Sequence, residues 1–242
     1  MIDLHSHILP ELDDGSRSIS ESLEMARLAA ESGITAVVAT PHCMDGRAGQ
    51  VRSAALLLRE ALHEAEIPLR LYMGMEIFGT AETARLLREK KLFTINNSRY
   101  PLIEFSFRSG GREETGILQS VIRAGYRPLI AHPERYSYVL EDPKLINLWK
   151  RMGCFFQVNR GSLMGRFGNG PRQLGMELVG RGFATVVASD AHSASVRTPW
   201  MQDVRELLSR EVSPVAAEYL LLRNPKSIIR NEKLPSAEPE WF

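Results

Sequence analysis

Cysteine is scarce in this sequence, and so is net charge. Two cysteines, Cys43 and Cys154, stand among 242 residues, so their number and spacing give no disulfide framework. The 30 basic side chains are balanced by 29 acidic ones, which leaves a formal charge of +1. This balance excludes the strongly basic surface by which many proteins bind nucleic acid or an anionic membrane.

Long apolar runs and low-complexity segments are also missing. No run approaches the ~18 residues that a membrane-spanning helix needs, and the first residues do not have the pattern of a secretory signal. We therefore expect a cytoplasmic protein that neither inserts into a membrane nor binds nucleic acid. The length suits one large α/β domain with a sizeable core. We predict that this domain covers residues 1–234 and that the polar, proline-rich residues 235–242 form a loose tail.

Short apolar runs alternate with amphipathic stretches along the chain. The amphipathic stretches have the spacing of helices, and the first adds a capping box from Ser18 to Glu21 and a stop at Gly33. This alternation predicts a (β/α) barrel or a doubly wound parallel sheet, and periodicity does not choose between them. The predicted strands are Met1–Leu4, Thr35–Thr40, Leu69–Gly74, Leu102–Phe105, Leu129–Ala131, Phe155–Val158 and Thr185–Ala188, and the predicted helices lie at 18–33, 50–65, 80–90, 113–124, 143–152, 171–181, 199–209 and 214–223.

Side chains that bind metal ions stand at the ends of six of these strands. In α/β barrels the carboxyl ends of the strands meet at the edge that holds the active site, so we expect these side chains to form one site. His63, in the middle of a predicted helix, is interpreted instead as a surface residue. The candidates are His5, His7, Asp13, Asp14, His42, Glu76, Glu104, His132, Arg135, Asp190 and His192.

The residue types favour a metal centre. His5 and His7 alternate along one strand, which directs both imidazoles to the same side. Glu104 interrupts an apolar run, where an ionised carboxylate needs either a metal ion or a buried salt bridge. Imidazole and carboxylate ligands without thiolate suit Mn, Fe or Zn in hydrolytic enzymes. Roughly nine candidate ligands exceed the needs of one ion, so we expect two or three ions bridged by a carboxylate such as Glu76.

Several motifs together resemble a known family. HSHILPELDDG, ATPH, GMEI, LIEF, AHPERY, GSLMGRFG and ASDAH are similar to motifs of the PHP (polymerase and histidinol phosphatase) superfamily. Within it they resemble the bacterial tyrosine phosphatases encoded with capsule and exopolysaccharide genes, and the likeness runs from Met1 to about Pro225. It implies a distorted seven-stranded (β/α) TIM-like barrel with three metal ions, usually Mn²⁺. The implied substrate is phosphotyrosine in the tail of a bacterial tyrosine autokinase that governs polysaccharide export.

The resemblance also implies a role for each candidate. Arg135 and Arg197 match arginines that contact phosphate, and a metal-bound hydroxide attacks phosphorus without a covalent cysteine intermediate. Asp14 or a metal-bound water would serve as the general acid. Departures from the family pattern lie outside the ligands, at Ala131 and Arg160. The implied ligands are His5, His7, Glu76 and Asp190 for the first metal; Glu76, Glu104 and His132 for the second; and Asp14, His42 and His192 for the third.

Other functions remain open from the sequence. Cys154 and Arg160 have the spacing of a cysteine phosphatase loop, but the intervening FFQVN is bulky and strand-like, whereas a phosphate loop needs small residues. Histidinol-phosphate phosphatase is an alternative enzyme with similar ligands. A nuclease-like PHP module lacks the basic charge for the nucleic-acid backbone. A metal-binding regulator of the export machinery is the non-enzyme alternative. The exposed-aromatic candidates Tyr136, Tyr138 and Trp200 would line a phosphotyrosine-peptide groove or simply pack.

Overall fold

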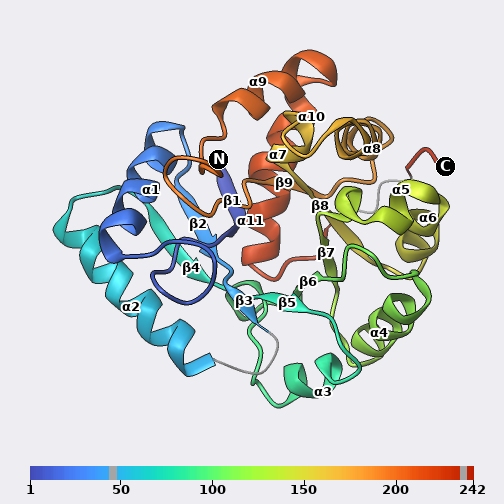
Figure 1. The fold of residues 1–242 in the computed structure, drawn as a ribbon, viewed down its shortest axis with the longest axis horizontal. Helices are drawn as coiled ribbons and strands as arrows, with labels where there is room; N and C mark the ends of the chain where they lie inside the picture. Colours follow the sequence, from blue (N-terminus) through green and yellow to red (C-terminus); the bar gives the residue numbers. More distant parts are fainter. Residues whose placement is uncertain (44–47, 235–238) are drawn as a thin grey trace.

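Parallel strands lie at the centre of the computed structural model, and helices surround them (Figure 1). The structure describes residues 1–43, 48–234 and 239–242. The strands are β1 (Ile2–Ser6), β2 (Ala36–Ala39), β3 (His42–Cys43), β4 (Arg70–Met73), β5 (Glu76–Phe78), β6 (Leu102–Glu104), β7 (Leu129–Ala131), β8 (Phe155–Asn159) and β9 (Val186–Ala188). The α-helices are α1 (Ile19–Glu31), α2 (Ala48–Glu64), α3 (Thr83–Arg88), α4 (Arg112–Arg123), α5 (Ser137–Glu141), α6 (Lys144–Arg151), α7 (Arg160–Leu163), α8 (Asn169–Gly180), α9 (Gln202–Glu211), α10 (Pro214–Glu218) and α11 (Asn224–Ile229), with short helices η1 (Ile95–Asn97), η2 (Pro133–Arg135) and η3 (Tyr219–Arg223).

The strands pair in parallel throughout. One sheet has the order β1-β2-β4 and the other the order β3-β5-β6-β7-β8-β9. The seven predicted strands correspond to β1, β2, β4 and β6 to β9. The short strands β3 and β5, which follow β2 and β4 after two-residue breaks, were not predicted. This confirms the α/β class with parallel strands.

The first and last strands meet through few contacts. Ser6 and Ala191 form a single parallel bridge, the His7 amide donates to the Ala191 carbonyl at 2.8 Å, and the Asp190 amide donates to the His5 carbonyl at 2.9 Å. Complete closure of a seven-stranded barrel stays a prediction. These contacts nevertheless bring the ends of β1 and β9 side by side, which is where the candidate site residues lie.

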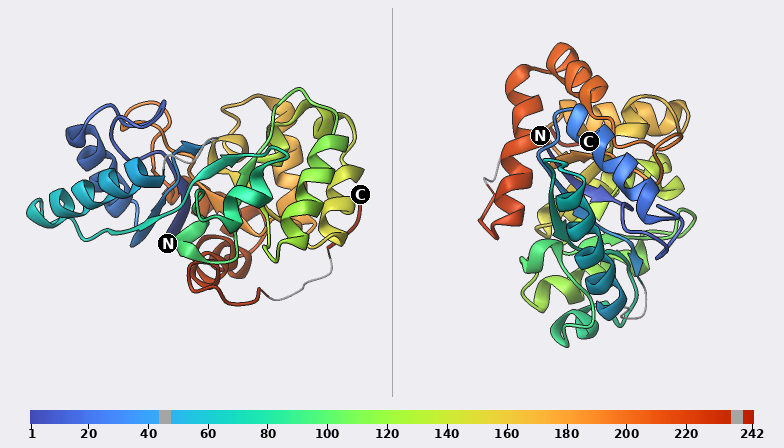
Figure 2. Two further views of the ribbon diagram at one scale, coloured as in Figure 1. Left: turned by 90° about the horizontal axis from the view of Figure 1, so that it is seen from below. Right: turned by 90° about the vertical axis from the view of Figure 1, so that its left-hand side faces the viewer.

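Apolar side chains cover both faces of the strands. A large cluster lies between the strands and the outer helices, and Leu58, Phe156 and Trp149 belong to it. A smaller cluster joins Leu4 of β1 and Leu102 of β6 to residues of α11, among them Ile228. Burial on both faces explains why the strands have continuous apolar runs rather than alternating patterns. Helices η3 and α11 lie along one side of the strands (Figure 2).

Local signals place the first helix accurately. Ser18 is the N-cap of α1 and its Oγ accepts from the Glu21 amide at 3.2 Å, while Gly33 adopts φ +86° just beyond the helix end. The Glu21 carboxylate bonds the Arg17 amide rather than that of Ser18, so only half of the capping box forms. Helices α5, α7 and α11 were not anticipated, because four to six residues are too few for a helical period.

The end of the chain makes definite contacts. Residues 235–238, half of the predicted tail, lie outside the described residues. The Phe242 amide donates to Asn147 Oδ1 at 3.2 Å, and the Phe242 ring stacks on Phe183 with centroids 5.2 Å apart. Residues 239–242 thus pack against the domain rather than lie loose, and the division of the chain at residue 234 stays a prediction. Within the described ranges, the helices are all too short or too polar to cross a membrane.

Candidate metal centre and phosphate site

Two buried histidines from the first strand form the middle of the site. The His5 Nε2 and His7 Nε2 atoms face each other at 3.2 Å, as their alternation on β1 predicts. Both lie near one oxygen of Glu76, at 3.0 Å and 3.1 Å, and near Asp190 Oδ1, at 3.4 Å and 3.5 Å. Ligand atoms of these four residues lie within 4.8 Å of one another. These are the four residues expected to hold the first metal.

The outer nitrogens of both imidazoles have partners that fix the rings. His7 Nδ1 donates to Asp13 Oδ2 at 2.6 Å, and His5 Nδ1 donates to Gln157 Oε1 at 3.0 Å. An imidazole whose Nδ1 carries the proton presents the lone pair of Nε2 inward. Metal-binding histidines in proteins are usually oriented by such a carboxylate or carbonyl partner.

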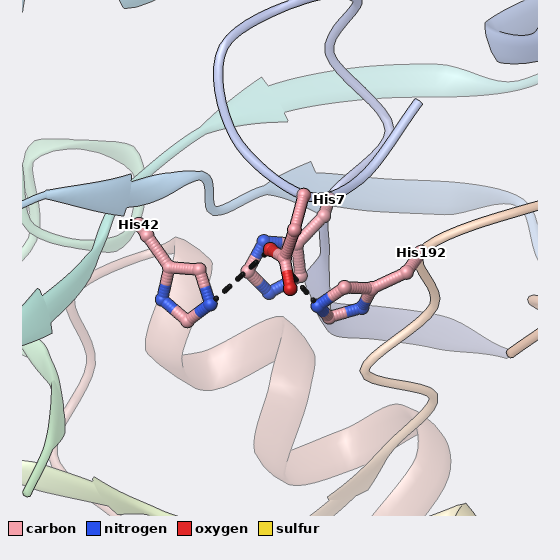
Figure 3. Close-up of side chains that lie close together, drawn as sticks. His7, His42 and His192 are labelled. Atoms are coloured by element: carbon pink, nitrogen blue, oxygen red, sulfur yellow. Dashed lines mark ion pairs between the residues drawn. The ribbon is translucent and has the colours of Figure 1, made fainter. Parts of the chain in front are cut away.

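A second group of ligand atoms lies nearer the surface. Asp14 Oδ1 is 3.5 Å from His42 Nε2 and 3.4 Å from His192 Nε2. The imidazoles of His7, His42 and His192 turn toward one region from three separate segments of the chain (Figure 3). The Asp14 side chain is 65% exposed, whereas His7 is fully buried, so this group connects the buried cluster to solvent. Between the adjacent acids, Asp13 orients His7 and Asp14 faces the other histidines.

A third group of ligand atoms combines Glu76 with Glu104 and two histidines. His42 Nδ1 lies 3.1 Å from Glu76 Oε2 and 3.5 Å from Glu104 Oε2. His132 Nε2 lies 2.8 Å from Glu76 Oε1 and 3.6 Å from Glu104 Oε1. Glu76 therefore contacts every neighbouring ligand set, which is the position of a bridging carboxylate. The predicted second site contained His132, and the geometry brings His42 to the same two carboxylates.

Two of these residues occupy a backbone region that side chains rarely adopt. His132 has φ 31° directly after β7, and Asp190 has φ 51° two residues beyond the end of β9. A non-glycine residue with positive φ is strained by roughly 1–3 kcal/mol, and such residues concentrate at functional sites. The strain at both strand ends turns the side chains toward Glu76 instead of continuing the strand.

Burial and charge shift the pKa values across the cluster. Burial opposes protonation of His5, but the carboxylates of Glu76 and Asp190 outweigh it and raise its pKa to about 9. Burial and the Glu76 charge raise the pKa of Glu104 to about 8. Burial and the His7 charge lower the pKa of His192 to about 4. The buried negative charge of the cluster thus favours the protonated forms of His5 and Glu104.

Two arginines approach the cluster at Asp190. Arg135 Nη1 lies 3.3 Å from Asp190 Oδ2, and Arg197 Nη2 contacts the same oxygen. Arg197 Nη1 also donates to His192 Nε2 at 3.1 Å. Both guanidinium groups are partly exposed, at 19% and 28% of their side-chain surface, so they border the space beside the ligands. The two predicted phosphate-binding residues are therefore adjacent.

The donor set fits divalent cations. Glu76 Oε2 is buried and accepts no hydrogen bond, although three imidazole nitrogens lie 3.0–3.1 Å away. Within the described part of the chain, Glu104 has no arginine or lysine ion-pair partner, so the salt bridge considered from sequence does not form there. A buried carboxylate oxygen without a hydrogen bond is costly unless a cation binds it. Hard oxygen and imidazole ligands in this number suit two or three ions.

Comparisons with known proteins agree with this geometry. Residues 1–230 match the family described as "Capsular polysaccharide synthesis, CpsB/CapC". The chain belongs to this family. The tyrosine-protein phosphatase YwqE of Bacillus subtilis is 35% identical over 99% of this chain and 96% of its own, and the tyrosine-protein phosphatase CpsB of Streptococcus pneumoniae is 30% identical over 96% and 99%. A crystal structure from a pair described as YwqE and CpsB, "unique metal-dependent tyrosine phosphatases", superimposes with a TM-score of 0.94 and 34% identity over 100% of this chain and 99% of that one.

The structure also reveals two polar residues near the ligands that the sequence interpretation overlooked. Gln157 and Asn159 are buried on β8, and Gln157 Nε2 donates to Asn159 Oδ1 at 2.7 Å. Asn159 Nδ2 then donates to Asp190 Oδ2 at 2.5 Å. This amide chain links His5 to Asp190 across the sheet. Its signal in the sequence is the alternation of polar residues within the apolar strand FFQVN.

The structure also decides between alternatives for five other positions. Cys154 is buried and burial raises the pKa of its thiol to about 12, so it is not an activated nucleophile. Arg160, the first residue of α7, pairs with Asp203 at 2.8 Å and 2.5 Å. Tyr136 is fully buried and its hydroxyl donates to the Ala131 carbonyl at 2.7 Å, and Tyr138 is also buried, so the interpretation of these two as exposed groove residues was wrong. Only Trp200 of the three is exposed.

Proposed function

We propose that this chain is a metal-dependent protein-tyrosine phosphatase. It removes phosphate from the phosphotyrosine tail of a bacterial tyrosine kinase in the cytoplasm and so regulates capsule or exopolysaccharide synthesis. Family membership and the tyrosine phosphatases among the relatives support the activity. The observation that carries the proposal is the convergence of buried imidazole and carboxylate ligands on Glu76, with two arginines beside them at Asp190.

We further propose that the ligands hold three Mn²⁺ ions. His5, His7, Glu76 and Asp190 would bind the first ion. Glu76 and Glu104 with His132 would bind the second, and Asp14, His42 and His192 the third. Fe or Zn would suit the same donors, since imidazole and carboxylate ligands accept several divalent metals. When bound, such ions activate water at neutral pH and neutralise negative charge on a phosphate ester.

The side chains of the protein would divide the remaining work. Arg135 and Arg197 would bind the phosphoryl oxygens, where a planar guanidinium offers two parallel donors. Asp190 now accepts from both arginines, so it fixes the direction in which they approach the cluster. Tyrosine has a pKa of about 10, so its phenolate leaves more easily than an alkoxide and requires little help from a general acid. If a general acid is needed, the exposed Asp14 or a metal-bound water would supply the proton.

Metal dependence is the first test. Chelator-stripped protein is assayed for phosphate release from a phosphotyrosine peptide, before and after addition of Mn²⁺. We expect no release when stripped and recovery with Mn²⁺. Activity without metal would refute the proposal. Inactivity in both states would favour another phosphoester, histidinol phosphate first, or a metal-binding regulator without turnover.

Matched variants test the assigned residues. Arg197→Ala should lower kcat/KM, because it removes transition-state stabilisation on the order of 2–4 kcal/mol. Arg85→Ala, on α3 and paired with Glu82 and Glu89, is the control arginine and should change little. His42→Ala should lower bound metal measured by mass spectrometry, whereas His63→Ala on the exposed surface of α2 should not. Unchanged kcat/KM in Arg197→Ala would remove that residue from the mechanism.

A further inference from the structure

One phenylalanine ring lies against both candidate phosphate-binding arginines. The Arg135 Cζ atom is 4.1 Å from the centroid of the Phe167 ring, and the Arg197 Cζ atom is 5.8 Å from the same centroid. Phe107 adds a second ring, 4.8 Å from Arg135. Phe107 contacts only one of the two arginines in this way, whereas Phe167 contacts both. The ring of Phe167 is therefore the element that the two guanidinium groups share besides Asp190.

The position of Phe167 is itself fixed by the segment GSLMGRFG. A Cβ atom added to Gly161 would lie 2.7 Å from Phe167 Cε2, so the ring packs directly on the backbone of that glycine. The Arg166 amide donates to the Gly161 carbonyl at 2.9 Å, which closes the turn. The Arg166 guanidinium donates to the Val196 carbonyl and so connects this turn to the segment carrying Arg197. The segment GSLMGRFG contains no proposed metal ligand, and its contacts fix the position of the Phe167 ring.

An aromatic face is a suitable support for two neighbouring cations. Guanidinium groups stack on aromatic rings because the ring face is negative and because arginine is weakly hydrated. Two like charges that converge on one carboxylate repel each other, and each arginine has several rotamers that would relieve the repulsion. Contact with Phe167 restricts those rotamers and leaves the N–H groups at the edges of both guanidinium planes able to donate hydrogen bonds, as they do to Asp190. Restricting side chains before binding raises affinity by reducing the entropy lost on association.

We propose that Phe167 is a positioning residue that holds Arg135 and Arg197 as one phosphate-binding pair. The inference rests on the proposed function in so far as the substrate is a phosphate ester. It is nevertheless measurable without turnover, because inorganic phosphate would bind the same arginines. The ring itself makes no contact with the reacting atoms.

The test measures inorganic phosphate binding by calorimetry to Mn²⁺-loaded protein, and kcat/KM on a phosphotyrosine peptide. Phe167→Leu retains an apolar side chain but removes the ring, and should weaken phosphate binding about three- to thirtyfold. Gly161→Ala reaches the same ring by a different route, since its methyl group must displace the ring, and should have an effect in the same direction. Phe155→Leu is the matched control: this ring lies 5.9 Å from Lys150 at the opposite end of β8 and should leave both quantities unchanged.

A double-mutant comparison separates positioning from general support of the fold. In the Arg135→Ala/Arg197→Ala background, Phe167→Leu should change phosphate binding less than twofold, because its effect passes through the arginines. An equal loss of phosphate affinity on Phe167→Leu in the wild-type and double-alanine backgrounds would overturn the proposal. Phosphate affinity equal to that of the wild type in Phe167→Leu or in Gly161→Ala would also overturn it. If Phe167→Leu does not fold, Gly161→Ala decides the question. A wild-type protein that binds phosphate without hydrolysing the peptide would refute the proposed function alone.

Discussion

Rising pH should destabilise the metal-free protein and stabilise the metal-loaded one. The argument begins at His5, which is fully buried between Glu76 and Asp190 and has its pKa raised from 6.5 to about 9. A proton held more tightly by the folded than by the unfolded state stabilises folding below the unfolded pKa. That contribution is lost as the pH rises through the folded pKa. The window for His5 therefore runs from about pH 6.5 to about pH 9.

The size of the effect follows from the shift. At 1.36 kcal/mol per pKa unit, the protonated imidazole contributes about 3 kcal/mol at pH 5.5 and roughly 2 kcal/mol less at pH 8. Glu104 also makes the folded state less stable as the pH rises. Burial and the Glu76 charge raise its pKa from 4.5 to about 8, so the carboxyl group loses its proton at lower pH in the unfolded chain than in the folded one. When cations are bound, the free energy of unfolding should instead increase with pH. Metal ligands must lose their protons, so affinity at fixed free Mn²⁺, and with it the stabilisation by metal, increases with pH.

Urea unfolding at pH 5.5, 7 and 8 measures both trends. Chelated protein should lose free energy of unfolding across the series, and protein at a fixed free Mn²⁺ concentration should gain it. His5→Gln removes the titrating group and should flatten the slope of the chelated protein, whereas His63→Gln, at the exposed site on α2, should keep the slope of the wild type. A chelated protein whose stability is constant or increases from pH 5.5 to 8 would refute the reasoning.

Three further predictions concern residues outside the ligand sets. Gln157→Met removes the acceptor of His5 Nδ1 and should lower metal affinity about 10- to 100-fold, measured by competition with a chelating dye; unchanged affinity would show that the amide does not orient the ring. Arg160→Leu breaks the pair with Asp203 and should lower the free energy of unfolding by about 2–4 kcal/mol in urea titrations, and a loss of kcat/KM at full stability would instead make Arg160 a phosphate ligand. Cys154→Ala should retain kcat/KM within about twofold and iodoacetamide should not inhibit the wild type, since the thiol is buried with a pKa of about 12.

The sequence alone predicted the edge at which the site lies, because each candidate follows an apolar run. Parallel strands place their carboxyl ends together, so His5, Glu76 and Asp190 had to converge once the runs were interpreted as strands. The fine arrangement was not predictable in this way. Asp13 and Asp14 are adjacent and chemically identical, and only the folded loop directs one to His7 Nδ1 and the other to His42.

Other features depend on contacts between distant segments and leave no periodic signal. Helix α11 has six residues, and its Ile228 and Ile229 take their place from the apolar cluster of the strands. The contacts of Phe167 with two arginines also leave no periodic signal, because Arg135 lies 32 residues before Phe167 in the chain and Arg197 lies 30 residues after it. Gln157 differs, since its polar side chain within an apolar strand is visible in the sequence and needs a partner when buried.

Several departures from the rules for a stable domain lie together around Glu76. Glu76 and Glu104 are buried side by side, His132 and Asp190 adopt positive φ, and Glu76 Oε2 accepts no hydrogen bond. Each departure costs free energy, and apolar residues in ordinary conformations would be more stable. The combination of these departures around one carboxylate, beside two arginines, is expected if the cluster exists to bind cations and phosphate and its cost is offset by the surrounding apolar core.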